Sequence, residues 1–405
     1  MQIGLHLASW FHPKAGKWVE GRKNWRKSLQ VYKAKSSAEK TLWMHVSSLG
    51  EFEQGRPVLE RFHQDYPEWE IVLSFFSPSG YEIRKEYPIA NYILYLPTDT
   101  PRQASDFLNI FKPDIAIFVK YDFWANYLLG LKNQQTPTLL ISALFRPSQL
   151  FFKWYGSFWR NVLSAFSEIQ VQNERSAELL KSINIDKCII AGDTRIDRVM
   201  RLAKEVAPNK TVEEFSNGKD LIIAGSTWEA DEKLLSGLMG LEICQNMKFI
   251  IAPHAPSEQN ITRICSIFEN AVRYSAFKTG INDSSRVLVI DNVGMLNSLY
   301  RYGKIAYIGG GFGSGIHNTL EPAAFGLPIL FGPKYRKFEE AVQFVARNGA
   351  FSVLDTAELV NSITSLQDPV YYKKASNAVL HYLAENEGAS EVAMNWIHQH
   401  TRHKS

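Results

Sequence analysis

Residues 307–334 read YIGGGFGSGIHNTLEPAAFGLPILFGPK, and the interpretation of the whole chain starts from them. An apolar run at 305–308 predicts a buried strand, a cluster of glycines follows it, and an apolar helical segment opens at 317–322. Glycines between a strand and a helix let the backbone approach an anion closely, and a helix N-terminus supplies free N–H groups and a positive dipole end. Glu321 lies one turn inside this helix, where its carboxylate can accept hydrogen bonds from ribose hydroxyls. We therefore interpret the stretch as a nucleotide-sugar site.

A plain βα unit, whose glycines only form turns, is the alternative interpretation of the same stretch. The glycines are accompanied by Asn318, Glu321 and Pro322, and a Gly332-Pro333 turn closes the strand that follows. This combination favours the ligand-binding interpretation.

The rest of the chain alternates short apolar strands with helical stretches such as 54–65 and 79–87. In the N-terminal half, strands are predicted at 43–46, 71–75, 93–95, 115–119, 138–142 and 168–172. In the C-terminal half they are predicted at 221–224, 249–252, 287–290, 305–308 and 328–331. Such alternation indicates an α/β fold with parallel sheets that are covered on both faces.

The domain organisation follows from chain length and from one polar stretch. A chain of 405 residues is long for one core, and residues 208–220 are polar enough to predict a linker. We expect an N-terminal domain at 1–207, a C-terminal domain at 221–378 and a terminal segment at 379–405. Two doubly wound domains would hold ligands in the cleft between them, at the carboxyl ends of the strands.

The composition is ordinary for a folded soluble protein, with 45% apolar and 21% charged residues. The formal net charge of +4 is too small to indicate a nucleic-acid partner. Cys188, Cys244 and Cys265 lack paired spacing, which is typical of a reduced, cytosolic protein. No stretch approaches the ~18 apolar residues of a spanning helix, and no cluster of His, Asp and Glu has metal-ligand spacing. We therefore expect no membrane span, no metal and no cofactor.

The N-terminus nevertheless combines an apolar face with many cations. Ile3, Leu7, Trp10 and Phe11 fall on one face of a helix. The basic residues that follow are Lys14, Lys17, Arg22, Lys23, Arg26, Lys27, Lys33 and Lys35. This pattern fits peripheral attachment to an anionic bilayer, and the alternative is a terminal helix docked on its domain with a solvated basic face.

Residues 42–57 read LWMHVSSLGEFEQGRP and place a carboxylate where a strand turns into a helix. Glu51 at this turn is a candidate general base, because a sugar hydroxyl must lose its proton as the new bond forms. Alternatively, Glu51 is a helix-start acid favoured by the dipole, with Glu53 as the competing base. Arg56 and Arg195 are candidates to meet an acidic sugar, or each forms a structural ion pair.

Two further loops follow predicted strands. Gly225, Ser226 and Thr227 open a helix, so they either hold a phosphate or form a simple N-cap. His254 follows the next strand and could contact a phosphate or a base, although most loop histidines have no such role. In a third segment, 145–159, Phe152, Trp154 and Trp159 lie off the predicted core face, which indicates either a lipid-facing patch or packing between elements.

Five motifs occur in one order along nearly the whole chain. They are HVSSLGE ending at Glu51, FW-x-N at 123–126, AGDTRID at 191–197, AGSTWEADE at 224–232 and GGGFG…HNTLEPAAFGLPILFGP at 309–333. Together they resemble the 3-deoxy-D-manno-octulosonic acid (Kdo) transferases of lipopolysaccharide assembly.

The resemblance implies a GT-B architecture, which is two Rossmann-like domains facing a central cleft, with a C-terminal helix at 379–400 that crosses back to the first domain. It implies that Kdo is transferred from CMP-Kdo to a lipid A precursor with inversion and without a required metal. It also implies a protein that is peripheral to the cytoplasmic face of the inner membrane. Carried onto matching positions, Glu51 is the catalytic base, and the donor contacts are Gly225, Ser226, Thr227, Gly311, Asn318 and Glu321.

One departure and two rival functions accompany the resemblance. Where many relatives have an ETELWPN-like stretch, this chain has KYDFWAN at 120–126, so a role of the first glutamate of that pattern does not carry over. The rival enzyme is a UDP-sugar transferase or epimerase of the same architecture. The rival from another class is a non-catalytic, membrane-associated scaffold, against which the presence of Glu51 and Glu321 argues.

Overall fold

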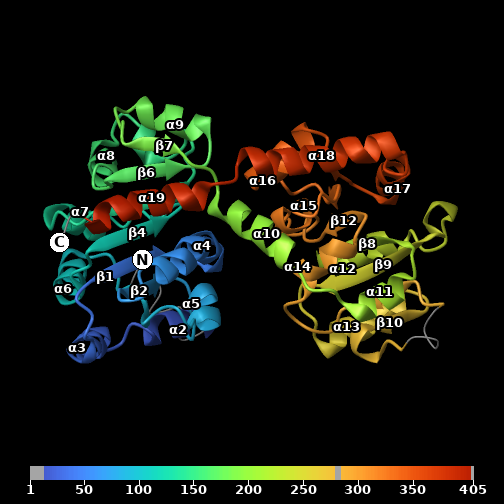
Figure 1. Cartoon of the computed structure of the whole chain (residues 1–405), viewed down its shortest axis with the longest axis horizontal. Helices are drawn as coiled ribbons and strands as arrows, with labels where there is room; N and C mark the ends of the chain where they lie inside the picture. Colours follow the sequence, from blue (N-terminus) through green and yellow to red (C-terminus); the bar gives the residue numbers. More distant parts are fainter. Residues whose placement is uncertain (1–12, 279–283, 403–405) are drawn as a thin grey trace. The chain divides into compact units, whose positions relative to one another are not determined.

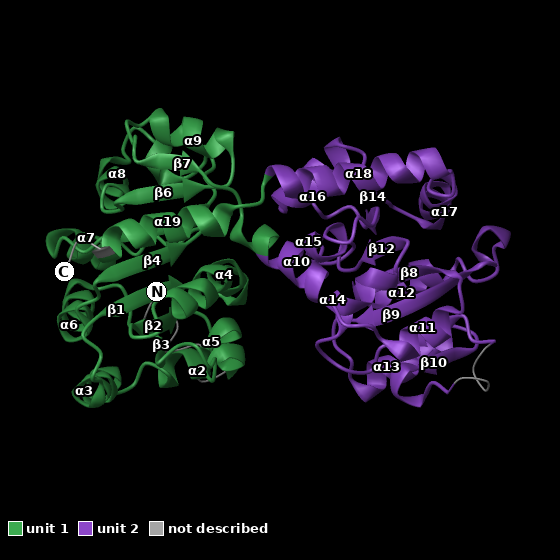
Figure 2. Cartoon of the chain, in the orientation of Figure 1, with its two compact units in different colours: residues 1–197, 386–405 green, residues 198–385 purple. Residues whose placement is uncertain are grey.

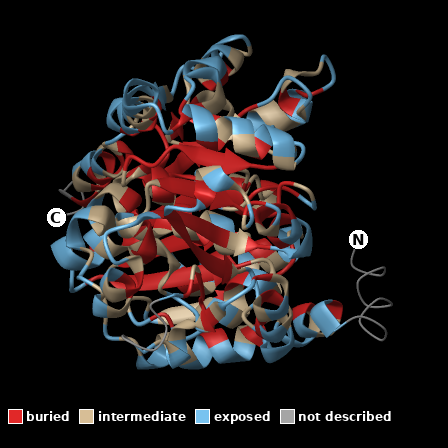
Figure 3. Ribbon diagram, turned by 90° about the vertical axis from the view of Figure 1, so that its right-hand side faces the viewer, coloured by how far each residue is buried: buried red, intermediate tan, exposed pale blue. Residues whose placement is uncertain are grey.

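The structure is a computed structural model that describes residues 13–278 and 284–402 (Figure 1). The apolar N-terminal face predicted at Ile3, Leu7, Trp10 and Phe11 lies outside these residues. Buried residues gather in the strands, and the exposed ones lie mostly on the outer sides of helices and on loops (Figure 3).

The chain forms two compact units (Figure 2). Unit 1 contains residues 1–197 and 386–405, and unit 2 contains residues 198–385. The chain leaves unit 1 within α10 (Thr194–Glu205) and returns to it after α18 (Pro369–Glu385).

Unit 1 is built on a seven-stranded parallel sheet with the order β3-β2-β1-β4-β5-β6-β7. The strands are β1 (Thr41–Val46), β2 (Glu70–Phe75), β3 (Tyr92–Tyr95), β4 (Ile115–Val119), β5 (Thr138–Ala143), β6 (Glu168–Val171) and β7 (Cys188–Ile190). The helices are α2 (Pro13–Glu20), α3 (Trp25–Lys35), α4 (Leu49–Asp65), α5 (Pro78–Arg84), α6 (Pro101–Phe111), α7 (Ala125–Asn133), α8 (Ser157–Leu163), α9 (Glu174–Lys181) and α19 (Ala389–Arg402). Two hydrophobic clusters, one with α3, α6 and α7 and the other with α4 and α19, sandwich the sheet. Because both faces are covered, β1 is buried along its whole length.

Unit 2 repeats this plan with the strand order β10-β11-β9-β8-β12-β13-β14, again all parallel. The strands are β8 (Asp220–Thr227), β9 (Met247–Pro253), β10 (Ala271–Arg273), β11 (Val287–Val289), β12 (Ile305–Ile308), β13 (Ile329–Phe331) and β14 (Ala350–Ser352). The helices besides α10 and α18 are α11 (Lys210–Ser216), α12 (Glu229–Ser236), α13 (Glu258–Ile267), α14 (Leu296–Leu299), α15 (Leu320–Ala323), α16 (Glu339–Ala346) and α17 (Thr356–Ser365). The prediction of an α/β fold with two Rossmann-like domains is thus confirmed.

Every predicted strand is present, and three strands were not predicted. These are β7, β10 and β14, each of which is three residues long and lies at an edge of its sheet. An edge strand is covered less completely than a central one, so its sequence carries a weaker apolar signal; Ile189 and Ile190 in β7 are indeed exposed.

The linker predicted at 208–220 is wrong, because most of this stretch is the helix α11 inside unit 2. Val212 and Phe215 are fully buried, and the Asn209 side chain caps the helix by accepting a hydrogen bond from the Val212 N–H. The polar residues that indicated a linker form the cap and the exposed face of this short helix.

The single C-terminal helix predicted at 379–400 is also wrong, since α18 ends at Glu385 and α19 begins at Ala389. Gly388 between them has φ of +106°, which breaks the helical path. The Asp197 carboxylate accepts hydrogen bonds from the backbone N–H groups of Gly388 and Ser390 at 2.6 Å each. The AGDTRID motif therefore anchors the start of α19 within unit 1.

Candidate active site

In unit 1, Glu51 lies in the first turn of α4, directly after the carboxyl end of β1. Ser48 is the N-cap residue with extended backbone, and its hydroxyl donates a hydrogen bond to the Glu51 carboxylate. Glu51 is half-buried. The carboxylate is thus oriented by its own helix start, and this geometry is compatible with both the general-base and the helix-start interpretations.

A second carboxyl group, which the sequence analysis missed, faces the same turn from the end of β4. Asp122 is almost fully buried and accepts hydrogen bonds from the Ser47 N–H (3.1 Å), the Ser47 hydroxyl and the Trp124 indole N–H (3.3 Å). Burial raises the pKa of Asp122 to about 8; its hydrogen bonds oppose this rise, and the charge of Glu51 adds to it. At neutral pH Asp122 is therefore protonated.

His45 on β1 completes this buried group. Its Nδ1 is 2.8 Å from the Ser74 hydroxyl, and its Nε2 lies 3.9 Å from the Asp122 carboxyl oxygen. Burial lowers the pKa of His45 to about 3, so the ring is neutral and forms no ion pair with Asp122. The position of Asp122 in KYDFWAN, right after a predicted strand, was the signal that could have identified it.

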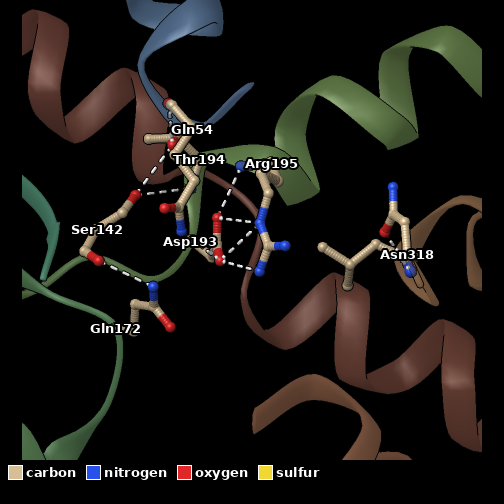
Figure 4. A network of polar contacts seen from close by, with 8 residues as sticks. Gln54, Ser142, Gln172, Asp193, Thr194, Arg195 and Asn318 are labelled. Carbon is tan, nitrogen blue, oxygen red and sulfur yellow. Dashed lines mark hydrogen bonds and ion pairs between the residues drawn. The ribbon is translucent and has the colours of Figure 1, made fainter. Parts of the chain in front are cut away.

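The two arginines proposed to meet an acidic sugar both lie in ion pairs within unit 1. Arg56 Nε is 2.7 Å from a Glu60 carboxylate oxygen. Arg195 reaches the Asp193 carboxylate at 2.7 Å, and the Gln54 amide reaches the same carboxylate at 2.9 Å (Figure 4). These contacts agree with the structural ion-pair interpretation.

The environment of Asp193 shows how strong this pairing is. Burial alone would raise the pKa of Asp193, but the charge and hydrogen bonds of Arg195 hold it below its usual value. Thr194 beside it hydrogen-bonds the Ser142 hydroxyl at 2.9 Å and donates to the Gln54 carbonyl (Figure 4). The AGDTRID motif therefore connects α4, β5 and α10 through buried hydrogen bonds.

In unit 2, the glycine-rich loop leaves β12 and ends in α15, which has only four residues. The apolar helical segment predicted to open at 317–322 is present but short, because Gly326 adopts a φ of +71° and the chain turns into β13. A Cβ atom on Gly311 would lie 2.6 Å from the Gly332 backbone, and one on Gly225 would lie 2.2 Å from the Tyr300 hydroxyl. Close packing within unit 2 already requires glycine at both of these predicted donor contacts.

The carboxyl end of β8 carries the next two predicted donor contacts. Ser226 is a non-glycine residue with φ of +54°, at a register shift between β8 and β9. Such strain is found preferentially at functional sites. The Thr227 hydroxyl is buried and donates to Glu232 at 3.0 Å, so within unit 2 this hydroxyl already has a partner.

Asp231 in the first turn of α12 holds the two loops together, and the sequence analysis missed it. Its carboxylate accepts hydrogen bonds from the backbone N–H groups of Gly310 and Trp228 and from the Tyr307 hydroxyl, each at 2.9 Å. Glu229 and Glu232 lie in the same turn. These acids occupy the positive end of α12, so that helix end is a poorer phosphate site than its sequence indicated.

Asn318 and Glu321 are brought together at the end of the glycine-rich loop. The Asn318 amide donates to the Glu321 carboxylate at 3.0 Å, and its oxygen accepts from the Leu320 N–H at 3.0 Å. Asn318 is exposed and Glu321 is half-buried. The pair presents polar groups suited to hydroxyls of a sugar or a ribose.

His254, the remaining predicted donor contact, is exposed and stacks on Trp228 with ring centroids 4.6 Å apart. Within residues 13–278 and 284–402, no group of His, Cys, Asp and Glu is arranged to hold a metal ion. In the same part of the chain, no helix has the length and apolar character needed to cross a membrane.

The two units define a protein of GT-B architecture. UDP-GlcNAc 2-epimerase from Neisseria meningitidis, solved with UDP-GlcNAc, superposes with a TM-score of 0.61, and the match covers 89% of this chain and 100% of that chain. At 18% sequence identity this likeness establishes the fold alone.

The sequence comparisons give the family. Residues 23–198 match the family described as 3-deoxy-D-manno-octulosonic-acid transferase (kdotransferase). The chain is 28% identical to the Kdo transferase of Aquifex aeolicus over 80% of this chain and 85% of that protein. It is 24% identical to that of Haemophilus influenzae over 88% of this chain and 86% of that protein. Residues 23–198 are therefore similar to the Kdo-transferase family, and the chain is similar to these named transferases over most of its length, which confirms the resemblance drawn from the motifs.

Proposed function

We propose that this protein is an inverting glycosyltransferase that moves Kdo from CMP-Kdo to a lipid A precursor in lipopolysaccharide assembly. The similarity to named Kdo transferases supports the reaction class. The observation that carries the mechanism is Glu51, a carboxylate oriented by Ser48 at the carboxyl end of β1.

The proposed reaction is a single displacement. Glu51 takes the proton of an acceptor hydroxyl, and the hydroxyl oxygen attacks the anomeric carbon of Kdo. The new glycosidic C–O bond forms as the bond from this carbon to the phosphate oxygen breaks, and CMP departs with both electrons. Asn318 and Glu321 in unit 2 would hold hydroxyls of the donor.

Asp122 supports this role for Glu51. Because burial raises its pKa to about 8, Asp122 holds its own proton at pH 7 and is not available as the base, which leaves that role to Glu51. The competing base, Glu53, lies in an ion pair with Arg84 at 2.9 Å, so its carboxylate already has a partner within unit 1.

The test is CMP release from freshly generated CMP-Kdo, with and without a tetra-acylated lipid A precursor. Wild type should release CMP in a lipid-dependent manner, Glu51→Gln should not, and the matched variant Glu53→Gln should behave as wild type. Lipid-dependent release that survives in Glu51→Gln but vanishes in Glu53→Gln would move the base to Glu53. If CMP-Kdo is not consumed but a UDP-sugar is, the rival enzyme function replaces this one.

We also propose that unit 1 contacts the cytoplasmic face of the inner membrane as a peripheral protein. Exposed apolar rings support this: 91% of Trp154, 56% of Tyr155 and 53% of Phe158 is accessible. Phe152 and Trp159, by contrast, pack on Phe151. Of the two interpretations of this segment, packing holds for these two rings, and a lipid-facing role is proposed for the exposed three.

Cations and a cavity on unit 1 support the same proposal. Lys23 and Lys27 line a cavity of about 490 Å³ beside α3, whose first turn contains no acid. Flotation with anionic liposomes should recover wild type at low salt and lose it as salt rises. The variant Trp154→Ser should bind more weakly, and absence of binding at every salt concentration would refute membrane contact.

A further inference from the structure

Three rings meet at the carboxyl ends of neighbouring strands in unit 2. Trp228 follows β8, His254 follows β9, and His317 belongs to the loop that follows β12. These strands are adjacent in the order β9-β8-β12. The rings therefore lie where an open parallel sheet binds its ligands, and the proposed mechanism does not yet use them.

Trp228 and His317 form one flat surface. Their planes differ by only 10°, and their centroids are 6.5 Å apart, which is too far for face-to-face stacking. The Trp228 indole N–H instead donates to His317 Nε2 at 3.1 Å, so the two rings lie edge to edge. His254 stacks on both, with centroids 4.6 Å from Trp228 and 4.5 Å from His317.

This hydrogen bond determines the state of His317. An indole N–H can only donate, so Nε2 of His317 must present its lone pair, and the proton of the neutral ring must reside on Nδ1. Burial, reinforced by the neighbouring His254, lowers the pKa of His317 to about 4, in agreement with a neutral ring. In the described part of the chain, Nδ1 has no hydrogen-bond partner, and it is not among the buried unsatisfied atoms. The Nδ1–H group is therefore an accessible donor.

We propose that His317 donates its Nδ1–H to an anionic oxygen of the nucleotide-sugar donor, and that Trp228 is the positioning residue that holds His317 in this tautomer. The anionic oxygen belongs to the phosphate or to the sugar carboxylate, since both present the same acceptor chemistry. The inference rests on the proposed function for the identity of the donor, but the Trp228–His317 pairing does not depend on it.

His317 is a neutral donor because it is half-buried and stacked on His254, although acidic residues lie close to Trp228 in the sequence. Asp231, Glu229 and Glu232 lie in the first turn of α12, directly after Trp228, and Glu232 is already paired with Arg263 at 2.6 Å. His254 is the titratable group stacked on His317, and its protonation would oppose that of His317. A fixed N–H dipole thus binds an anion without introducing a charge that the surrounding rings would have to desolvate.

The first test measures the tautomer directly by nitrogen-15 NMR of the imidazole rings in the whole protein. Wild type should show His317 neutral at pH 7 with the proton on Nδ1. Trp228→Phe keeps a ring for stacking on His254 but removes the N–H, so His317 should shift toward the Nε2–H tautomer. A wild-type His317 protonated on Nε2, or a tautomer unchanged in Trp228→Phe, would overturn the pairing.

The second test measures binding of CMP and the KM for CMP-Kdo in the same variants. Trp228→Phe should weaken binding about fivefold, the effect of one misdirected hydrogen bond, with kcat changed less than KM. Weaker binding of both ligands assigns the phosphate as the acceptor, and weaker binding of CMP-Kdo alone assigns the carboxylate. Unchanged binding of both would refute the proposal. If wild type binds neither ligand, the proposed function fails, while the tautomer spectrum still decides the pairing.

The matched control is Trp396→Phe in α19. Trp396 also stacks on a histidine, His400, at 3.9 Å, but the His400 ring is hydrogen-bonded to the Trp396 carbonyl rather than to its indole. This variant should leave the His317 tautomer, CMP binding and the KM for CMP-Kdo unchanged. A loss of binding equal to that in Trp228→Phe would show a general effect of tryptophan replacement and refute the specific role of Trp228.

Discussion

Units 1 and 2 differ in strand order at one edge of the sheet, but the centres of the two sheets correspond, and the site residues occupy equivalent positions there. In unit 1 the first strand, β1, lies between β2 and β4. In unit 2 the first strand, β8, lies between β9 and β12. In unit 1 the loops after β1 and β4 bring Glu51 and Asp122 to this point, and in unit 2 the loops after β8 and β12 bring Trp228 and His317.

The difference between the units lies in the chemistry of these loops. Unit 1 presents two carboxyl groups, Glu51 in the first turn of a helix and the buried, protonated Asp122, an arrangement suited to moving a proton. Unit 2 presents glycines, a neutral histidine and the Asn318–Glu321 pair, an arrangement suited to binding a polar ligand. We therefore propose that the same fold supports proton transfer in one unit and ligand binding in the other, because the loops rather than the sheet carry the chemistry.

The largest effect should come from Glu51→Gln, which keeps the shape of the side chain and removes its basicity. We expect kcat to fall about 1,000-fold, within the range for loss of a general base, while CMP affinity stays at the wild-type value. Single-turnover CMP release and equilibrium CMP binding measure the two quantities. A variant that loses CMP affinity and retains kcat would contradict the assignment of proton transfer to unit 1 and of donor binding to unit 2.

The next effect concerns the internal brace of unit 2. Asp231→Ala leaves three donors without their acceptor, the N–H groups of Gly310 and Trp228 and the Tyr307 hydroxyl. We expect a loss of about 3 kcal/mol in the local stability of unit 2, measured by hydrogen exchange on the intact chain. Glu229→Ala, an exposed acid of the same turn, is the control and should change stability little. Equal loss of protection in unit 1 and unit 2 would contradict a brace confined to unit 2.

A smaller effect should come from Glu321→Ala. Removal of this carboxylate also frees the Asn318 amide that it orients. The KM for CMP-Kdo should rise about tenfold with kcat nearly unchanged, as expected for lost ligand binding. Steady-state kinetics over a range of CMP-Kdo concentrations tests this, and a fall in kcat without a change in KM would place Glu321 in the chemical step.

The smallest effect is a pH dependence in unit 1. Because the folded-state pKa of Asp122 is about 8, above its ordinary value of 3.8, the folded protein holds an extra proton between these values. Stability from Asp122 is therefore present at low pH and is lost as pH rises toward 8. Between pH 7 and pH 8 the free energy of unfolding of wild type should fall by about 1 kcal/mol more than that of Asp122→Asn, as measured by guanidinium unfolding. Identical pH dependence in variant and wild type would show that Asp122 is ionised in the fold.

Most of the sheet could be predicted because central strands are buried on both faces and so read as apolar runs. The strands β7, β10 and β14 could not, because three residues at an edge give no such run. The linker and the C-terminal helix were misplaced for a related reason. Polar composition at 208–220 does not distinguish a linker from a short helix with two buried residues, and one glycine at 388 ended a helix whose pattern continued.

The sequence by itself determined the architecture, the family resemblance and the loops that carry the site, because apolar periodicity and motif order are local properties of the chain. Glu51, Asn318 and Glu321 were found in this way. Only the tertiary structure decided the states of these loops: the neutral Asp122, the brace formed by Asp231, and the tautomer that Trp228 imposes on His317. Each of these states depends on burial and on a partner residue that is distant in the sequence. Neither burial nor such a partner can be inferred from a local stretch of sequence.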